Sequence, residues 1–147
     1  MGYPTYAPKS QNAANYQKIK IETATPEALI LMLYDGALRF MTQAELAFEE
    51  NNIEKINNSL LRVQAIFTEL QCSLDREKGG DIATNLERLY IFFNSQLIEA
   101  NMKKDVSYLQ AIRPMVQNLR DTWEVAMQKH QSTQQNVPPR SRLNLSA

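Results

Sequence analysis

Few residues of this 147-residue chain have the types and spacing that catalysis requires. The single histidine, His130, lies near the C-terminus, so no Ser or Cys has a histidine placed to serve as its general base. We expect His130 to be a surface residue and Cys72 to be a small packing residue. Four acidic residues fall on the polar faces of expected helices, where we expect them to be solvated: Asp35, Glu45, Glu87 and Glu99.

The patterns that bind metals and cofactors are also missing. A di-metal helical protein needs Glu-x-x-His on two helices, and a phosphotransfer bundle needs an exposed histidine in mid-helix; the sequence has neither. It also lacks a glycine-rich phosphate loop and a Cys-x-x-Cys pair. We therefore predict a protein that is not an enzyme and that uses no cofactor or metal.

Composition favours a single all-α domain in the cytoplasm. Apolar residues make up 44% of the chain, and the 4 glycines and 6 prolines are too few for the tight turns of an all-β fold. The net charge is zero, with an acidic body between cationic ends, which argues against a nucleic-acid partner. The first residues do not resemble a secretory signal, and no apolar run is long enough for direct membrane insertion.

The segment from Thr25 to Phe48 organises the rest of the chain. Thr25 is a predicted helix N-cap and Pro26 a suitable first helical residue. Its apolar residues recur three and four apart and form a core stripe: Ile30, Leu33, Ala37, Met41, Ala44 and Phe48. A second, adjacent stripe needs another cover: Leu31, Tyr34 and Leu38. Gly36 in mid-helix costs about 1 kcal/mol relative to alanine, and either an incoming chain or a neighbouring helix would explain it.

Three more helices are expected. The second, capped by Asn51, covers about residues 52–75, and its core positions are Ile53, Ile56, Leu60, Val63, Phe67, Leu70 and Leu74. Residues 75–80 are expected to form a loop with a left-handed Gly79. The third helix follows Asp81, with a core stripe of Leu86, Tyr90, Phe93, Leu97 and Ala100.

The fourth helix follows a short connection and a cap at Asp105. Its apolar residues are Leu109, Ile112, Val116, Leu119, Trp123 and Ala126. Pro114 interrupts this pattern and predicts a kink or a break into two shorter helices. Short connections make neighbouring helices antiparallel, so we predict an antiparallel up-down-up-down four-helix bundle with a short N-terminal covering segment.

Both ends of the chain have the polar composition of tails. We expect a mobile tail at residues 1–15, a helical-bundle domain at 16–130 and a disordered tail at 131–147. Within the domain, Tyr16, Ile19 and Ile21 are apolar residues among lysines and could cover the second stripe. The alternative is that residues 16–21 are a plain connector.

Several motifs in this order resemble the flagellar secretion chaperone FliS family, the export chaperones of flagellin. They are LYDGAL after a helix that begins with Thr-Pro, SLD followed shortly by GG, L-x-x-LY, and AN-x-x-x-D. The resemblance extends from about Tyr16 to Met127.

The resemblance implies a cytoplasmic chaperone that binds the disordered C-terminal segment of flagellin, prevents premature polymerisation and docks on the cytosolic domain of the flagellar export gate protein. The alternative is a self-associating bundle without a flagellin client, and a weak homodimer stays open. Combining the family motifs with the apolar stripes gives the expected flagellin-binding groove: Leu31, Leu33, Tyr34, Gly36, Ala37, Leu38, Leu89, Tyr90, Phe93 and Asn101. The family also has an N-terminal segment that folds over the bundle, which matches Tyr16, Ile19 and Ile21 as a groove cover.

Overall fold

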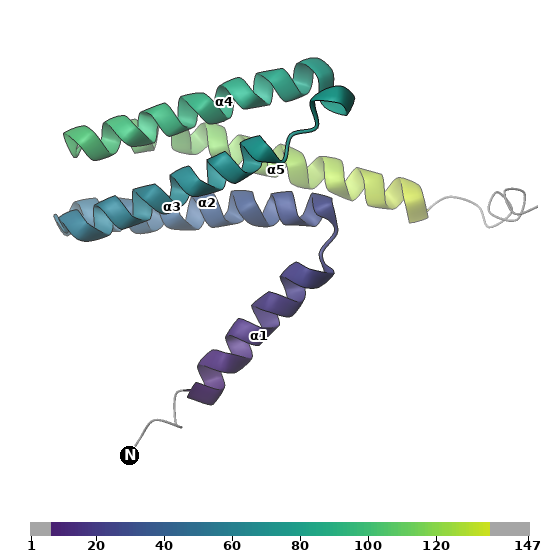
Figure 1. Ribbon diagram of the computed structural model, residues 1–147, viewed down its shortest axis with the longest axis horizontal. Coiled ribbons are helices and arrows are strands. Elements are labelled where there is room, and N and C mark those ends of the chain that lie inside the picture. The colour runs from purple at the N-terminus through teal and green to yellow at the C-terminus, as the bar shows by residue number, and fades with distance from the viewer. Residues whose placement is uncertain (1–6, 136–147) are drawn as a thin grey trace, which may run out of the picture.

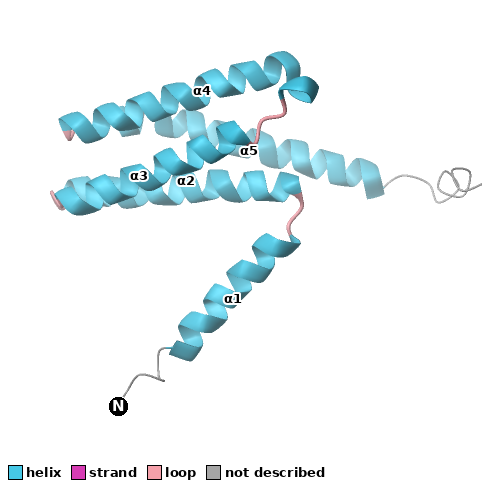
Figure 2. Ribbon diagram, viewed as in Figure 1, coloured by secondary structure: helices cyan, strands magenta, loops and turns pink. Residues whose placement is uncertain are grey.

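The described part of the chain is helical, with short connections (Figures 1 and 2). The computed structural model describes the backbone of residues 7–135 and the side chains of 12–133. Its elements are α1 (Ala7–Thr23), α2 (Pro26–Glu49), α3 (Ile53–Cys72), α4 (Arg76–Lys103) and α5 (Ser107–Gln135). The predicted all-α class is confirmed.

Helices α2 to α5 enclose the hydrophobic core. Helix α2 packs against α3 and α5, and α4 packs against the same two helices. On the α3–α4 boundary, Asn57 near the start of α3 accepts a hydrogen bond from Asn101 near the end of α4. Helices α3 and α4 are therefore antiparallel. Fully buried side chains come from all four helices and include Met41, Phe67, Phe93 and Ile112.

Helix α1 is the main departure from the predicted architecture, because the described chain has five helices and not four. It projects away from α2 to α5 (Figure 1). The exposed fractions of Tyr16, Ile19 and Ile21 are 65%, 58% and 49%, so these residues do not cover the core helices in this structure. Residues 7–23 do not concentrate their apolar side chains on one face, so α1 lacks a strong drive to pack.

Part of each predicted tail is helical within the described residues. Residues 7–15 are helical, since alanine, lysine and glutamine are good helix formers, and α5 continues to Gln135. The rest of the predicted tails, residues 1–6 and 136–147, lies outside the described residues.

Helix starts agree with the sequence prediction at Thr25 and shift by one residue at α3. The Thr25 side chain accepts a hydrogen bond from the Ala28 amide at 3.1 Å, as predicted. The cap of α3 is Asn52, not Asn51, because Asn51 takes a left-handed conformation with φ of 53° that asparagine tolerates.

The expected loop at 75–80 contains a helical turn. Asp75 caps this turn by accepting from the Lys78 amide, and the chain then bends at Gly80. The left-handed residue is Gly80, with φ of 51°, and not Gly79 as predicted. The long straight part of α4 follows this bend.

Pro114 does not divide the last helix into two, which was one of the two predicted outcomes; the other, a kink, stays a prediction. Helix α5 is continuous from Ser107 to Gln135, with Pro114 inside it. Both Pro114 and Gln110, whose carbonyl loses its usual partner, are exposed, so water can solvate that carbonyl. Ile112 and Val116 are fully buried and hold the helix to the core on either side of the proline.

Three residues predicted to pack inside are exposed. Ile53 and Cys72 are the first and last residues of α3, beyond the turns that α2 and α4 cover, and Ala126 lies on the part of α5 that extends past the core. The apolar period located the buried face, but not the point at which neighbouring helices stop covering it.

Candidate functional site

The largest mainly apolar hollow lies along α2 and α3, beside the end of α1. We call it the α2/α3 groove. Its volume is about 520 Å³, and its apolar lining consists of Ile21, Leu29, Met32, Leu33, Gly36, Phe40 and Ile66. Polar and charged residues complete it: Gln17, Lys20, Asp35, Arg39 and Glu69. The groove offers partly buried aliphatic and aromatic surface that solvent still reaches.

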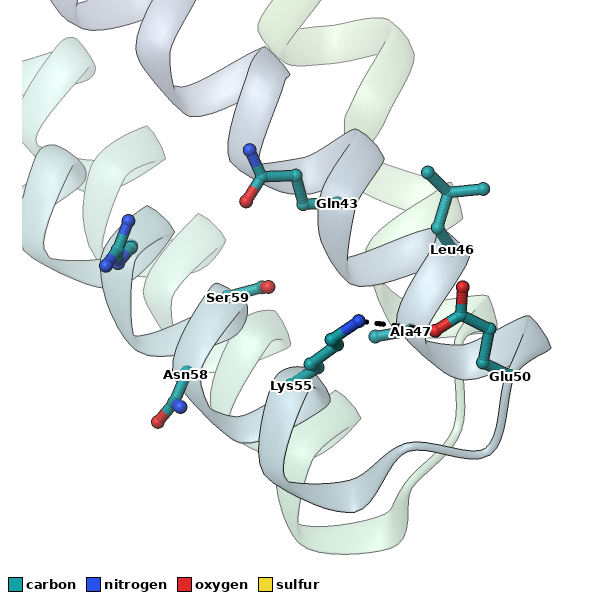
Figure 3. Close-up of a pocket in the computed structure, with 8 residues that line it drawn as sticks. Gln43, Leu46, Ala47, Glu50, Lys55, Asn58 and Ser59 are labelled. Carbon is teal, nitrogen blue, oxygen red and sulfur yellow. Dashed lines mark ion pairs between the residues drawn. The ribbon is translucent and has the colours of Figure 1, made fainter. Parts of the chain in front are cut away.

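A second hollow of about 380 Å³ lies further along the same two helices. Figure 3 shows Gln43, Leu46 and Ala47 of α2 together with Lys55, Asn58 and Ser59 of α3, which line this hollow. Lys55 points across it and forms an ion pair with Glu50 at 3.7 Å. Arg62 also lines this hollow, and its guanidinium lies over the ring of Phe40 in the α2/α3 groove. The two hollows are therefore adjacent, because Arg62 of one contacts Phe40 of the other.

Gly36 lies where α2 and α3 approach closely. A Cβ added to Gly36 would be 3.3 Å from the terminal methyl carbon of Ile66. Gly36 is buried and lines the α2/α3 groove. The structure therefore supports both explanations of this glycine, because it allows helix packing and forms part of the groove surface.

An apolar pocket of about 330 Å³ lies between α2, the start of α4 and α5; we call it the tyrosine pocket. Tyr34 and Tyr90 line it, and their hydroxyl oxygens are 2.5 Å apart. Burial raises the pKa of both phenols because it disfavours the charged phenolate. Trp123 closes one side and donates its indole N–H to the Glu27 carbonyl at 2.9 Å.

The structure divides the ten predicted groove residues among different places. Leu33 and Gly36 line the α2/α3 groove, whereas Tyr34 and Tyr90 line the tyrosine pocket. Ala37 and Phe93 are fully buried in the core. The other four line neither hollow: Leu31, Leu38 and Leu89 are partly buried, and Asn101 bonds Asn57 at the far end of α4.

Sequence reasoning missed several residues of the α2/α3 groove, including Leu29, Met32, Phe40 and Ile66. A signal was present on α2. Leu29, Met32, Gly36 and Phe40 are spaced three or four apart, which defines a third apolar stripe on a helix that was assigned only two.

The carboxylates that were expected to be solvated each have a cationic partner, which lies on a neighbouring helix for Asp35 and Glu45 and on the same helix for Glu87 and Glu99. Asp35 accepts from Arg120 at 2.7 Å, and Glu45 accepts from Arg113 at 2.5 Å. Glu87 pairs with Arg76, and Glu99 pairs with Lys103 at 3.0 Å. These carboxylates hold helices or turns together and do not converge on one point.

Within residues 7–135, no group of histidine, cysteine or acidic side chains could hold a metal ion. No helix in the described range is long and apolar enough to span a bilayer. Solvent-accessible apolar hollows on packed helices suit the recognition of another polypeptide. Fold and site thus define the class of helical protein-binding proteins.

Comparison with known proteins gives the particular family. The family model described as "Flagellar protein FliS" matches residues 9–130. The chain is 34% identical over 113 residues to the flagellar secretion chaperone FliS of Bacillus subtilis (strain 168), an alignment that covers 77% of this chain and 84% of that protein. The chain belongs to the FliS family.

Two further relatives cover similar shares of the chain. The flagellar secretion chaperone FliS of Campylobacter jejuni is 35% identical over 112 residues, or 76% of this chain and 86% of the relative. The flagellar secretion chaperone FliS of Salmonella typhimurium is 32% identical over 114 residues, which cover 74% of this chain and 84% of the relative. The resemblance seen in the sequence motifs is confirmed.

Proposed function

We propose that this protein is a flagellar secretion chaperone that binds the disordered C-terminal segment of flagellin. Membership of the FliS family supports the chaperone role. The observation that carries the binding role is the α2/α3 groove, whose apolar surface is open to solvent on one side of the packed helices. The chaperone works in the cytoplasm by binding alone, with no cofactor and no chemical step.

A disordered client that folds on binding needs a large apolar surface. Such interfaces bury on the order of 1,000 to 3,000 Å², part of which offsets the entropy lost on ordering. The α2/α3 groove and the tyrosine pocket lie beside different partners of α2, so a client that uses both must extend around this helix. Helix α4 adds exposed apolar side chains at Ile91, Ile98 and Met102.

The antiparallel arrangement of α2 to α5 is the scaffold in this proposal, and residues 16–130 are the chaperone domain. Keeping the client segment bound prevents flagellin from polymerising early. The loaded complex then docks on the cytosolic domain of the export gate protein of the flagellar apparatus.

Helix α1 is the movable part of the site in this proposal. Its residues Gln17, Lys20 and Ile21 already line one side of the α2/α3 groove, although the helix as a whole projects away. Only Ala24 and Thr25 separate α1 from α2. A rotation at this connection would bring Tyr16 and Ile19 over the groove in the free protein, and the client would displace them.

Calorimetric titration of the full chain with the C-terminal segment of the same organism's flagellin tests the proposal. We expect one-to-one binding with a negative change in heat capacity, because apolar surface is buried. The matched control is the N-terminal segment of the same flagellin, for which we expect no binding. A folded protein that binds neither segment, or a concentration-dependent dimer that hides the groove, would contradict the proposal.

A further inference from the structure

Resting on the proposed function, the structure points to a specific chemical feature of the client. We propose that Arg39 and Arg62 form a carboxylate-binding pair on the α2/α3 groove. The client segment that lies there therefore carries an acidic side chain beside its apolar residues. The apolar lining alone would bind any hydrophobic segment, so these arginines supply selectivity for a segment that also carries a carboxylate.

The two arginines come from different helices and both lie close to the same aromatic ring. The guanidinium carbon of Arg39, on α2, is 5.1 Å from the centre of the Phe40 ring. That of Arg62, on α3, is 5.2 Å from the same centre. A guanidinium stacked on a ring keeps N–H donors along its edge, where they can bind the two oxygens of a carboxylate. Contact with the ring thus leaves the N–H donors of both arginines available.

Neither Arg39 nor Arg62 forms an ion pair within the described residues, whereas three other described arginines do. Arg76, Arg113 and Arg120 each form an ion pair with a carboxylate. Both Arg39 and Arg62 are exposed, so a carboxylate from outside can reach them.

The acids near these arginines do not balance them. Asp35 lines the α2/α3 groove, but its carboxylate accepts from Arg120 at 2.7 Å. Glu69 is the other acidic lining residue, while Lys20 adds a third cation to the groove. The continuation adds Arg62 and the ion pair of Lys55 with Glu50. With Asp35 and Glu50 each paired to another cation, Glu69 is the one remaining acid of the two linings, against Lys20, Arg39 and Arg62.

This charge disfavours helix α1 of a second copy as the occupant. The side chains described on α1 include Lys18 and Lys20, and its one acid, Glu22, lies 4.0 Å from Lys18. A second α1 would bring further cations toward Arg39 and Arg62, whereas a client with a carboxylate would complement them. The same repulsion weakens the contact of the chain's own α1 with the groove, so a client can displace it. Charge therefore favours the client over self-association.

The test compares the wild-type chain with the double variant Arg39→Gln and Arg62→Gln, and uses Arg88→Gln as the control. Arg88 is an exposed residue of α4 outside both the groove and its continuation. Two probes are titrated into each protein: the C-terminal segment of flagellin, and the same segment with its acidic residues changed to Asn or Gln. Circular dichroism establishes that each variant is folded.

We expect the double variant to bind the unmodified segment at least about tenfold more weakly than wild type, with Arg88→Gln within about twofold. Neutralising the segment should weaken wild-type binding by a similar factor, and should not weaken the double variant further. Added salt should weaken binding to wild type more than binding to the double variant. A variant with Arg39→Lys and Arg62→Lys should bind the unmodified segment more tightly than the double glutamine variant but more weakly than wild type. Lysine keeps the charge of arginine but lacks its fork of N–H donors.

Equal affinity of wild type and double variant for the unmodified segment would overturn the inference and leave the proposed function standing. Equal binding of both segments by wild type would do the same. Failure of wild type to bind either segment would instead overturn the proposed function, and the inference with it.

Discussion

At the scale of single residues, the tyrosine pair shows how this core accommodates polar groups. Tyr34 and Tyr90 are each 2% exposed, and their hydroxyl groups bond to each other across α2 and α4. Mutual bonding removes the penalty that a lone buried hydroxyl would carry. The pair also joins two helices that are not neighbours in sequence.

The two hydroxyl groups should therefore behave as a unit. We expect Tyr34→Phe or Tyr90→Phe alone to lower the free energy of unfolding by about 1 to 3 kcal/mol, because the partner hydroxyl stays buried without its bond. The double phenylalanine variant should lose less than the sum of the single changes. Urea unfolding of the four proteins measures this cycle, and additive losses would contradict it.

The raised pKa values of these phenols also give a pH dependence. A raised pKa means that the folded protein holds the proton more tightly, so the contribution to stability is complete below the unfolded pKa of about 10. It is lost as the pH rises toward the folded values. The double phenylalanine variant should lack this alkaline loss, which unfolding measured at pH 8 and pH 11 would reveal.

Gly36 gives a second prediction at this scale. Gly36→Leu should place a side chain in the α2/α3 groove and weaken client binding at least about tenfold, or about 1.4 kcal/mol, with the helices still folded. Gly36→Ala is the control, because its Cβ meets the movable end of Ile66 at 3.3 Å and the end of Arg39 at 3.8 Å, which is an ordinary contact distance. We expect alanine to raise stability by up to about 1 kcal/mol. Unfolding of the leucine variant would show that helix packing alone requires this glycine.

At the scale of elements, α5 illustrates how tertiary packing overrides a local signal. Four hydrogen bonds tie it to α2: Arg113 to Glu45 and to Thr42, Arg120 to Asp35, and the Trp123 indole to the Glu27 carbonyl. Together with the buried residues on both sides of Pro114, they keep α5 a single helix where two shorter helices were one of the predicted outcomes.

Pro114 should therefore lower the free energy of unfolding without contributing to the packing of α5. We expect Pro114→Ala to raise the free energy of unfolding by about 1 to 2 kcal/mol, since alanine restores a donor for the Gln110 carbonyl and propagates the helix better. The exposed neighbour Met115 provides the control, as Met115→Ala should change stability by less than about 0.5 kcal/mol. Thermal or urea unfolding gives both values. No gain at Pro114 would mean that the helix accommodates the proline without a penalty.

At the scale of the whole molecule, the packed helices α2 to α5 contrast with the projecting α1. The four core helices share one hydrophobic core, whereas α1 places exposed apolar residues beside the α2/α3 groove. This contrast explains why we assign a moving role to α1 and a scaffold role to the other helices.

Hydrogen exchange can detect the motion of α1. We expect amides of residues 16–21 to be partly protected in the free protein and to exchange faster when the flagellin segment binds, because the client displaces them. Amides around the buried Phe93 should not change and serve as the internal reference. Identical exchange of residues 16–21 with and without client would contradict the covering role.

Residue spacing determined much of this fold by itself. The apolar period located the buried faces of α2 to α5, and the Thr25 cap, the short connections and the family motifs followed from the sequence. Local chemistry is sufficient for these features, because caps and helix periodicity depend on residues within a few positions of one another. The resemblance to the family, through its LYDGAL motif, predicted the groove residues Leu33 and Gly36.

Only the tertiary structure decided which apolar residues remain open to solvent. Ala37, Phe93, Leu33 and Phe40 all have suitable side chains, yet the first two are fully buried and the last two line the α2/α3 groove. The contact of Arg62 with the Phe40 ring, beside that of Arg39, also requires α2 and α3 to lie side by side. Exposure and contacts between helices depend on residues far apart in the sequence, and the period of a single helix contains no information about them.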